Sequence, residues 1–105
     1  MLSNLFDNIP NDLQEEQFID LIKNEQVRIE RIVSTGHTSP EGFWYDQAEH
    51  EFVIVLEGHA IVEFEDHEME LKRGDFLNIE AHQKHRVKYT DTDNTTVWLA
   101  VFYKQ

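Results

Sequence analysis

The sequence predicts an all-β fold in which short strands close into a single barrel. Strand-like runs recur at nearly regular spacing between residues 26 and 103, which is typical of a sandwich or a barrel. Turn residues, among them Gly58 and Gly74, separate these runs. A chain of 105 residues with 40% hydrophobic residues can build one core and has little room for a second domain.

The first 25 residues are expected to form an irregular arm followed by a short helix. Asn11 or Asp12 can cap this helix just after Pro10, and Glu15 stands three residues after Asp12, as in a capping box. Apolar residues then recur near helical spacing, at Leu13, Phe18, Leu21 and Ile22. A short helix is marginal alone in water, so we expect it to pack on the barrel or on a partner chain. Residues 1–25 are thus the arm and helix, and residues 26–105 are the barrel.

Alternating apolar residues place the strands of the barrel. The expected strands are residues 26–34, 43–47, 51–57, 59–65, a segment around Met69 and Leu71, 76–79, 85–90 and 95–103. Ala60, Val62 and Phe64 alternate with polar residues and should face the core. The last strand is apolar on both faces, so its outer face needs a cover, either the N-terminal helix or a second subunit. We therefore predict a homodimer.

The charge and the residue types narrow the possible partners and location. The chain has 21 acidic and 9 basic residues, a net charge of −12, which disfavours nucleic acid and anionic membranes as partners. No apolar run approaches the roughly 20 residues that span a bilayer. The N-terminus lacks the pattern of a secretory signal, and the chain has no cysteine. These features favour a cytoplasmic location.

Two segments resemble the paired motifs of the cupin family. Glu51 and Gly58 keep the spacing of the glutamate and glycine in the first motif, and Gly74 and His85 keep that of the glycine and histidine in the second. The resemblance covers roughly residues 27–103. It implies a cupin-type double-stranded β-helix, that is, a jelly-roll barrel whose functional site lies in the interior.

Four positions depart from the cupin motifs. Tyr45 and Gln47 stand where the first motif usually has two metal-binding histidines. In the second motif, Glu80 replaces a proline and His82 replaces a glycine. The run from Trp44 to Gln47 resembles a subgroup of small single-domain cupins with a Trp-Tyr-Asp-Gln motif, which implies the fold and no particular substrate.

Strand alternation gives a second reason to group the candidate site residues. Tyr45, Gln47 and Glu51 share one face of a continuous strand pattern and should point into the barrel. A buried carboxylate is costly without a cation or hydrogen-bond donors. His85 is the expected partner of Glu51, and these two would be the catalytic pair if the protein is an enzyme. Tyr45, Gln47 and His82 are the expected substrate pocket.

Three kinds of site remain open from the residues alone. Gln47, Glu51 and His85 could hold a divalent metal such as Zn, Mn, Fe or Ni, although a neutral glutamine is a weak ligand and firm sites usually have two or three imidazoles. Alternatively, Glu51 and His85 form a hydrogen-bonded pair in a polar pocket. The same pair could also perform acid–base catalysis without a metal.

The functions that match these sites belong to different classes. The leading hypothesis is a barrel that binds a small molecule in its interior at a degenerate metal site. The alternative is a metal-dependent isomerase, oxygenase or lyase that acts on a small polar substrate. A third hypothesis, a purely structural or partner-sensing module, requires an interior filled by side chains.

Overall fold

The protein is an eight-stranded antiparallel β structure. The computed structural model describes residues 2–104, and none of these residues forms a helix. The strands are β1 (Gln17–Lys23), β2 (Val27–Ser34), β3 (His50–Glu57), β4 (His59–Phe64), β5 (Glu68–Lys72), β6 (Phe76–Ile79), β7 (His85–Thr90) and β8 (Thr96–Tyr103). The expectation of an all-β fold is therefore confirmed, and most strand bounds lie within a residue or two of those expected.

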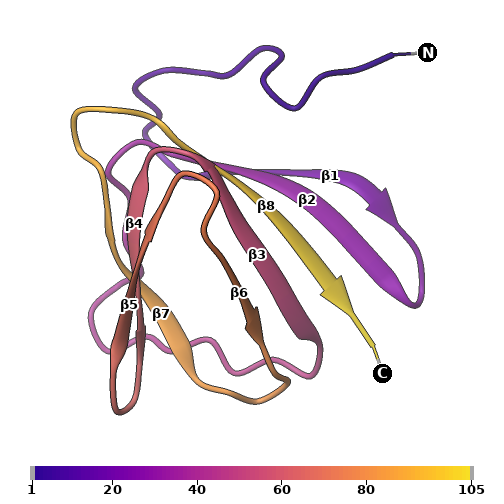
Figure 1. The fold of residues 1–105 in the computed structure, drawn as a ribbon, viewed down its shortest axis with the longest axis vertical. Helices are drawn as coiled ribbons and strands as arrows, with labels where there is room; N and C mark the ends of the chain where they lie inside the picture. The colour runs from indigo at the N-terminus through magenta and orange to yellow at the C-terminus, as the bar shows by residue number, and fades with distance from the viewer. Residues whose placement is uncertain (1, 105) are drawn as a thin grey trace.

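The strands form two sheets that face each other (Figure 1). The five-stranded sheet has the order β1-β2-β8-β3-β6, and the three-stranded sheet has the order β5-β4-β7. The last strand, β8, pairs with both β2 and β3, so it lies in the middle of the larger sheet. This order, with strands distant in sequence side by side, is the jelly-roll arrangement.

The core lies between the sheets, where the apolar faces of the strands meet. In β4, Ala60, Val62 and Phe64 are at most 6% exposed, as their alternation predicted. Val53 and Val55 of β3 meet them from the opposite sheet in the same cluster. The inward face of β3 is therefore confirmed, and it also carries Glu51, two residues before Val53.

The predicted N-terminal helix is wrong. Residues 17–23 form β1, which pairs antiparallel with β2 through partners such as Phe18 and Ile32. Asp12 has a positive φ of 55°, whereas a helix N-cap needs an extended backbone. The apparent helical spacing has a local cause, because the register shifts between Asp20 and Ile22 and the extra residue breaks the alternation of the strand.

The N-terminal arm packs on the larger sheet without helical structure. The Arg31 guanidinium of β2 donates hydrogen bonds to the carbonyls of Leu5 and Asp7, at 3.2 and 2.7 Å, and to the side-chain oxygen of Gln17 at 3.2 Å. Arg31 alternates with the inward Ile32, so it marks the outer face of the sheet. The arm is thus anchored over this face, while the homodimer stays a prediction.

No helix within residues 2–104 has the length and apolar character needed to cross a membrane.

Candidate functional site

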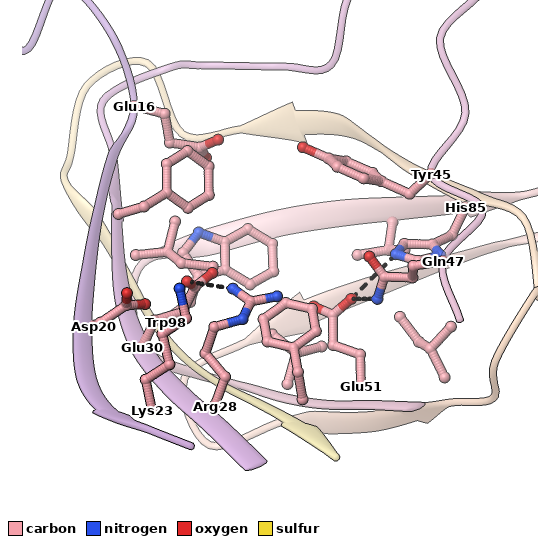
Figure 2. A pocket seen from close by; sticks show the side chains of 16 residues that line it. Glu16, Asp20, Lys23, Arg28, Glu30, Tyr45, Gln47, Glu51, His85 and Trp98 are labelled. Carbon is pink, nitrogen blue, oxygen red and sulfur yellow. Dashed lines mark hydrogen bonds and ion pairs between the residues drawn. The ribbon is translucent and has the colours of Figure 1, made fainter. Parts of the chain in front are cut away.

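A cavity of about 510 Å³ opens between the two sheets. Figure 2 shows that its polar side chains gather at two ends. One end contains Tyr45, Gln47, Glu51 and His85, and the other contains Glu16, Asp20, Lys23, Arg28 and Glu30. Between them lie apolar side chains of the core, including Val53, Val62, Ile79, Trp98 and Phe102. The barrel interior is therefore only partly filled.

Glu51 and His85 join the two sheets at the first end of the cavity. Glu51 is the second residue of β3, and His85 is the first residue of β7. Their side chains are 11% and 6% exposed, and His85 Nε2 lies 3.2 Å from Glu51 Oε1. The other ring nitrogen of His85, Nδ1, lies 2.9 Å from the Gln83 carbonyl, which can only accept a hydrogen bond.

This geometry requires the Glu51–His85 pair to carry a proton. Since Nδ1 donates to the Gln83 carbonyl, a neutral ring would present an acceptor at Nε2 to an accepting carboxylate. Either the imidazole is charged or the carboxyl group is protonated. Burial by itself lowers the pKa of His85, but the hydrogen bonds to Glu51 and Gln83 and the charge of Glu51 outweigh burial and raise it. The two buried side chains therefore share a proton at the wall of the cavity.

Gln47 and Tyr45 complete this end of the cavity. The Gln47 side-chain amide donates a hydrogen bond to Glu51 Oε1 at 3.1 Å, so this oxygen is close to both Gln47 and His85. Tyr45 is held by backbone hydrogen bonds in both directions with His85, and its ring stacks on the imidazole. Of the strand expected at residues 43–47, only an isolated antiparallel β-bridge between Tyr45 and His85 forms. The structure therefore brings together Tyr45, Gln47, Glu51 and His85.

The Tyr45 hydroxyl points into the cavity (Figure 2). Burial raises the pKa of Tyr45, and the negative charges of Glu16, Glu51 and Glu30 raise it further. The phenol therefore stays protonated at neutral pH and can donate a hydrogen bond to a ligand.

His82, expected in the substrate pocket, lies elsewhere. Its side chain is 69% exposed and pairs through Nδ1 with Asp46 Oδ1 at 2.7 Å. His82 has a positive φ of 64° at a position where the cupin motif has glycine, and this conformation directs the chain through a tight turn. Its backbone N–H donates to the Gln47 carbonyl at 2.8 Å, so His82 holds the loop against the site from outside the cavity.

The charged residues at the second end were not singled out from the sequence. Arg28, Glu30 and Ile32 alternate along β2 and face the cavity, which is a signal that strand alternation in residues 26–34 could have supplied. Glu16 and Asp20 depend on the position of β1, which was expected to be a helix. Their place in the cavity could not be inferred without that strand.

Hydrogen bonds hold the groups at the second end in place. Arg28 contacts Glu30 at 2.8 Å and Glu49 at 3.3 Å, and its guanidinium lies 4.0 Å from the centre of the Phe102 ring. The Ser34 hydroxyl donates a hydrogen bond to the Glu16 carboxylate and accepts one from Trp98 Nε1 at 3.1 Å. Burial raises the pKa of Glu16, and the same cause raises that of Glu30.

The three expected metal ligands lie together but make a poor donor set. Gln47, Glu51 and His85 supply one neutral amide, one carboxylate and one imidazole, and the amide nitrogen of Gln47 faces the carboxylate. Tyr45, with its raised pKa, resists the loss of the proton that a ligand phenolate requires. Within residues 2–104 no three His, Cys, Asp or Glu side chains form a metal-binding group. These residues do not fit a firmly bound divalent metal.

Comparisons with known proteins place the chain in a family. A structure from Ralstonia eutropha, named "a putative mannose-6-phosphate isomerase", is 40% identical, with a TM-score of 0.96 over 100% of this chain and 99% of that one. A cupin superfamily protein from Desulfitobacterium hafniense is 17% identical, with a TM-score of 0.78 over 92% of this chain and 84% of that one. A conserved protein of unknown function from Streptococcus pyogenes is 13% identical, with a TM-score of 0.80 over 100% and 88% of the chains.

No protein with a curated description matches the sequence. The family model described as "Cupin domain" matches residues 31–102, a span that includes Glu51 and His85 and runs from β2 into β8. The jelly-roll topology and the spacing of the two partial motifs agree with this match. The chain belongs to the cupin domain family.

Proposed function

We propose that the protein binds a small polar molecule in the cavity, with Glu51 and His85 as its central contacts. The observation that carries the proposal is a buried, proton-bearing pair of polar side chains at the wall of a cavity of about 510 Å³. A cavity of this size falls within the range of small-molecule sites. It also speaks against a purely structural barrel, which would have a filled interior.

The energetics of the pair support a role in binding. Replacing a buried ion pair by apolar side chains of similar volume is often neutral or stabilising, so such a pair is weak evidence for stability alone. Glu51 Oε1 accepts from Gln47 and His85, and Oε2 has no partner in the hydrogen bonds of residues 2–104. A ligand hydroxyl or amine can donate to that oxygen. The nearby Tyr45 hydroxyl supplies a second polar contact.

The second candidate function is an isomerase that works by proton transfer. The name of the 40% identical Ralstonia eutropha protein favours this candidate. Isomerisation of a hydroxy-carbonyl compound needs a base that moves a proton from one carbon to the neighbouring carbon, while the proton of the hydroxyl group passes to the former carbonyl oxygen. The Glu51 carboxylate can serve as this base through Oε2, while the Tyr45 phenol donates a hydrogen bond to the carbonyl oxygen. Both N–H groups of His85 are already bound, to Glu51 and to Gln83.

Ligand-induced stabilisation tests the binding proposal. A library of small polar metabolites is screened for an increase in the melting temperature of the wild-type protein, and each hit is titrated by calorimetry. We expect Glu51→Gln to weaken a genuine hit about tenfold or more, because a buried hydrogen-bonded charge is lost. The matched control is Glu70→Gln, which alters the exposed His59–Glu70 pair outside the cavity. Equal affinity in both variants would contradict the proposed site.

Turnover tests the isomerase candidate. Mannose 6-phosphate is incubated with wild-type protein and the Glu51→Gln variant, and the ketose product is measured. Loss of turnover in the folded variant supports catalysis by this pair. Ligand binding without product formation from the bound hydroxy-carbonyl compound would leave binding as the function and reject the isomerase.

A further inference from the structure

The charge of the cavity lining identifies the class of ligand. Four carboxylate side chains line the cavity, namely Glu16, Asp20, Glu30 and Glu51. The basic side chains are Lys23 and Arg28, together with the shared proton of the Glu51–His85 pair. The cavity therefore has more acidic than basic groups, and it lies in a protein with a net charge of −12.

The two basic side chains are poorly placed to reverse this balance. Arg28 is already paired with Glu30 and Glu49, so its charge is compensated within the protein. Lys23 is the last residue of β1 and is exposed, with no ion pair among the described residues. It lies at the charged end of the cavity, away from Tyr45 and His85 (Figure 2). An anionic ligand in the middle of the cavity would thus meet carboxylates on several sides.

Glu16 is the carboxylate best arranged to meet a ligand. Its Oε2 is held by the Ser34 hydroxyl, which Trp98 Nε1 holds in turn. Its Oε1 has no hydrogen-bond partner in the part of the chain between residues 2 and 104. Figure 2 shows the Glu16 carboxylate and the Tyr45 hydroxyl on the same side of the cavity, both directed toward its interior. Glu16 is partly buried, so its charge is weakly screened.

Aromatic rings provide the remaining surface that such a ligand needs. Phe18, Tyr45 and Trp98 line the cavity, as does Phe102, whose ring already contacts the Arg28 guanidinium. The faces of aromatic rings attract cations, and the attraction increases where water is excluded. Carboxylates combined with aromatic faces suit an ammonium group attached to a small organic body.

We propose, on the basis of the small-molecule function above, that the cavity selects a small organic cation whose ammonium group lies between Glu16 and Tyr45. A positive charge there compensates the desolvated carboxylates, and the raised pKa values of Glu16 and Glu30 would fall on binding. The same lining disfavours a phosphorylated sugar, although a phosphate group appears in the name of the Ralstonia eutropha relative.

Three sugars that share one ring and differ in charge test this inference. Mannosamine, mannose and mannose 6-phosphate are each titrated into the wild-type protein at pH 7.5 and low salt, and binding is measured by ligand-observed NMR and by thermal shift. We expect mannosamine to bind about tenfold or more tightly than mannose, and mannose 6-phosphate to bind least. Glu16→Gln should remove most of the preference for mannosamine, whereas Glu70→Gln, outside the cavity, should preserve it.

The possible outcomes separate this inference from the proposed function. Preference for mannose 6-phosphate, or equal binding of all three sugars, would overturn the selection of cations. If the binding of these sugars still depends on Glu51, the proposed small-molecule function stands and only the selection of cations is rejected. A preference for mannosamine that Glu16→Gln leaves unchanged would also overturn the assignment. If neither these sugars nor the metabolite library bind, both the inference and the proposed function fail.

Discussion

The Glu51–His85 pair predicts opposite pH dependences for its two single variants. In the folded protein the pair carries one proton, because Nδ1 donates to the Gln83 carbonyl and Nε2 lies 3.2 Å from Glu51. The perturbations are His85→Leu, which leaves a buried carboxyl group, and Glu51→Gln, which leaves a buried imidazole. The double variant removes both groups and reports the pH dependence of the rest of the molecule.

The magnitudes follow from the protons that each variant binds. With His85 replaced, the carboxyl group is left buried without its cationic partner, and burial disfavours its charged form in the folded state. Stability should therefore rise as the pH falls, by at most about 1.4 kcal/mol per pH unit, or about 2.7 kcal/mol between pH 7.5 and 5.5. With Glu51 replaced, the buried imidazole stays neutral while the unfolded one gains a proton near pH 6.5, so stability should fall by about 1.4 kcal/mol over the same range.

The stability of the wild-type protein should also depend on pH, and it should rise as the pH falls. A histidine whose pKa is raised on folding contributes stability that is fully present below the unfolded value and is lost as the pH rises through the folded value. Relative to the double variant, the wild type should gain stability on going from pH 7.5 to 5.5, by at most about 1.4 kcal/mol. Both pH values lie above the isoelectric point of about 4.7, where the protein keeps its net negative charge.

Urea denaturation at pH 7.5 and 5.5 measures these free energies of unfolding. His59→Leu serves as a further control, because the His59–Glu70 pair has the same chemistry in a more exposed position and should contribute at most about 1 kcal/mol. The reasoning is refuted if the two single variants respond to pH with the same sign. It is also refuted if the wild type follows the double variant, since the pair would then bind no proton on folding.

Four further predictions rest on other features. Glu16→Gln should raise the melting temperature at pH 7.5, because burial raises the pKa of this carboxyl group and its ionisation opposes folding. The gain should fade as the pH falls into the ordinary titration range of glutamate, and a gain independent of pH would contradict this reasoning. Gly58→Ala should destabilise the protein by about 3 kcal/mol or more in urea denaturation, because φ is 101° and the new Cβ would lie 2.5 Å from Thr96 Oγ1. Gly42→Ala, with a φ of 79° and open space around it, should cost clearly less, and equal costs would rule out the clash as the cause. Elemental analysis of the purified protein should find less than one equivalent of Zn, Mn, Fe or Ni per chain. A stoichiometric metal that survives chelation would show that these residues bind a metal firmly. Sedimentation should detect a homodimer at micromolar concentration, because Ile19 on the outer face of the edge strand β1 is 38% exposed. A monomer would count against this prediction.

Much of the barrel could be predicted from local patterns. The alternation of Ala60, Val62 and Phe64 predicts which face of β4 is buried, because successive side chains of a strand point to opposite faces. The same alternation through Val53 and Val55 directs Glu51 inward. These inferences hold because each depends on residues within one strand, and the hydrophobic effect acts on them in the same way in any jelly-roll arrangement.

Elements that depend on distant partners could not be predicted in this way. Phe18 and Ile22 fit a helix as well as a bulged strand, and the open edge of β2 decides between them by supplying backbone hydrogen-bond partners. Whether the His82 side chain faces the cavity or the solvent depends on its positive φ and on its contact with Asp46. Neither feature leaves a periodic signal in the sequence.

The sequence by itself determined the all-β fold, the inward position of Glu51 and its expected pairing with His85. Only the tertiary structure decided that β1 brings Glu16 to the opposite end of the same cavity, and that the Gln83 carbonyl forces a proton onto the Glu51–His85 pair. The physical reason is that strand alternation is a local property, whereas the charge of a cavity and the protonation of a buried pair are sums over groups that only folding brings within a few ångströms.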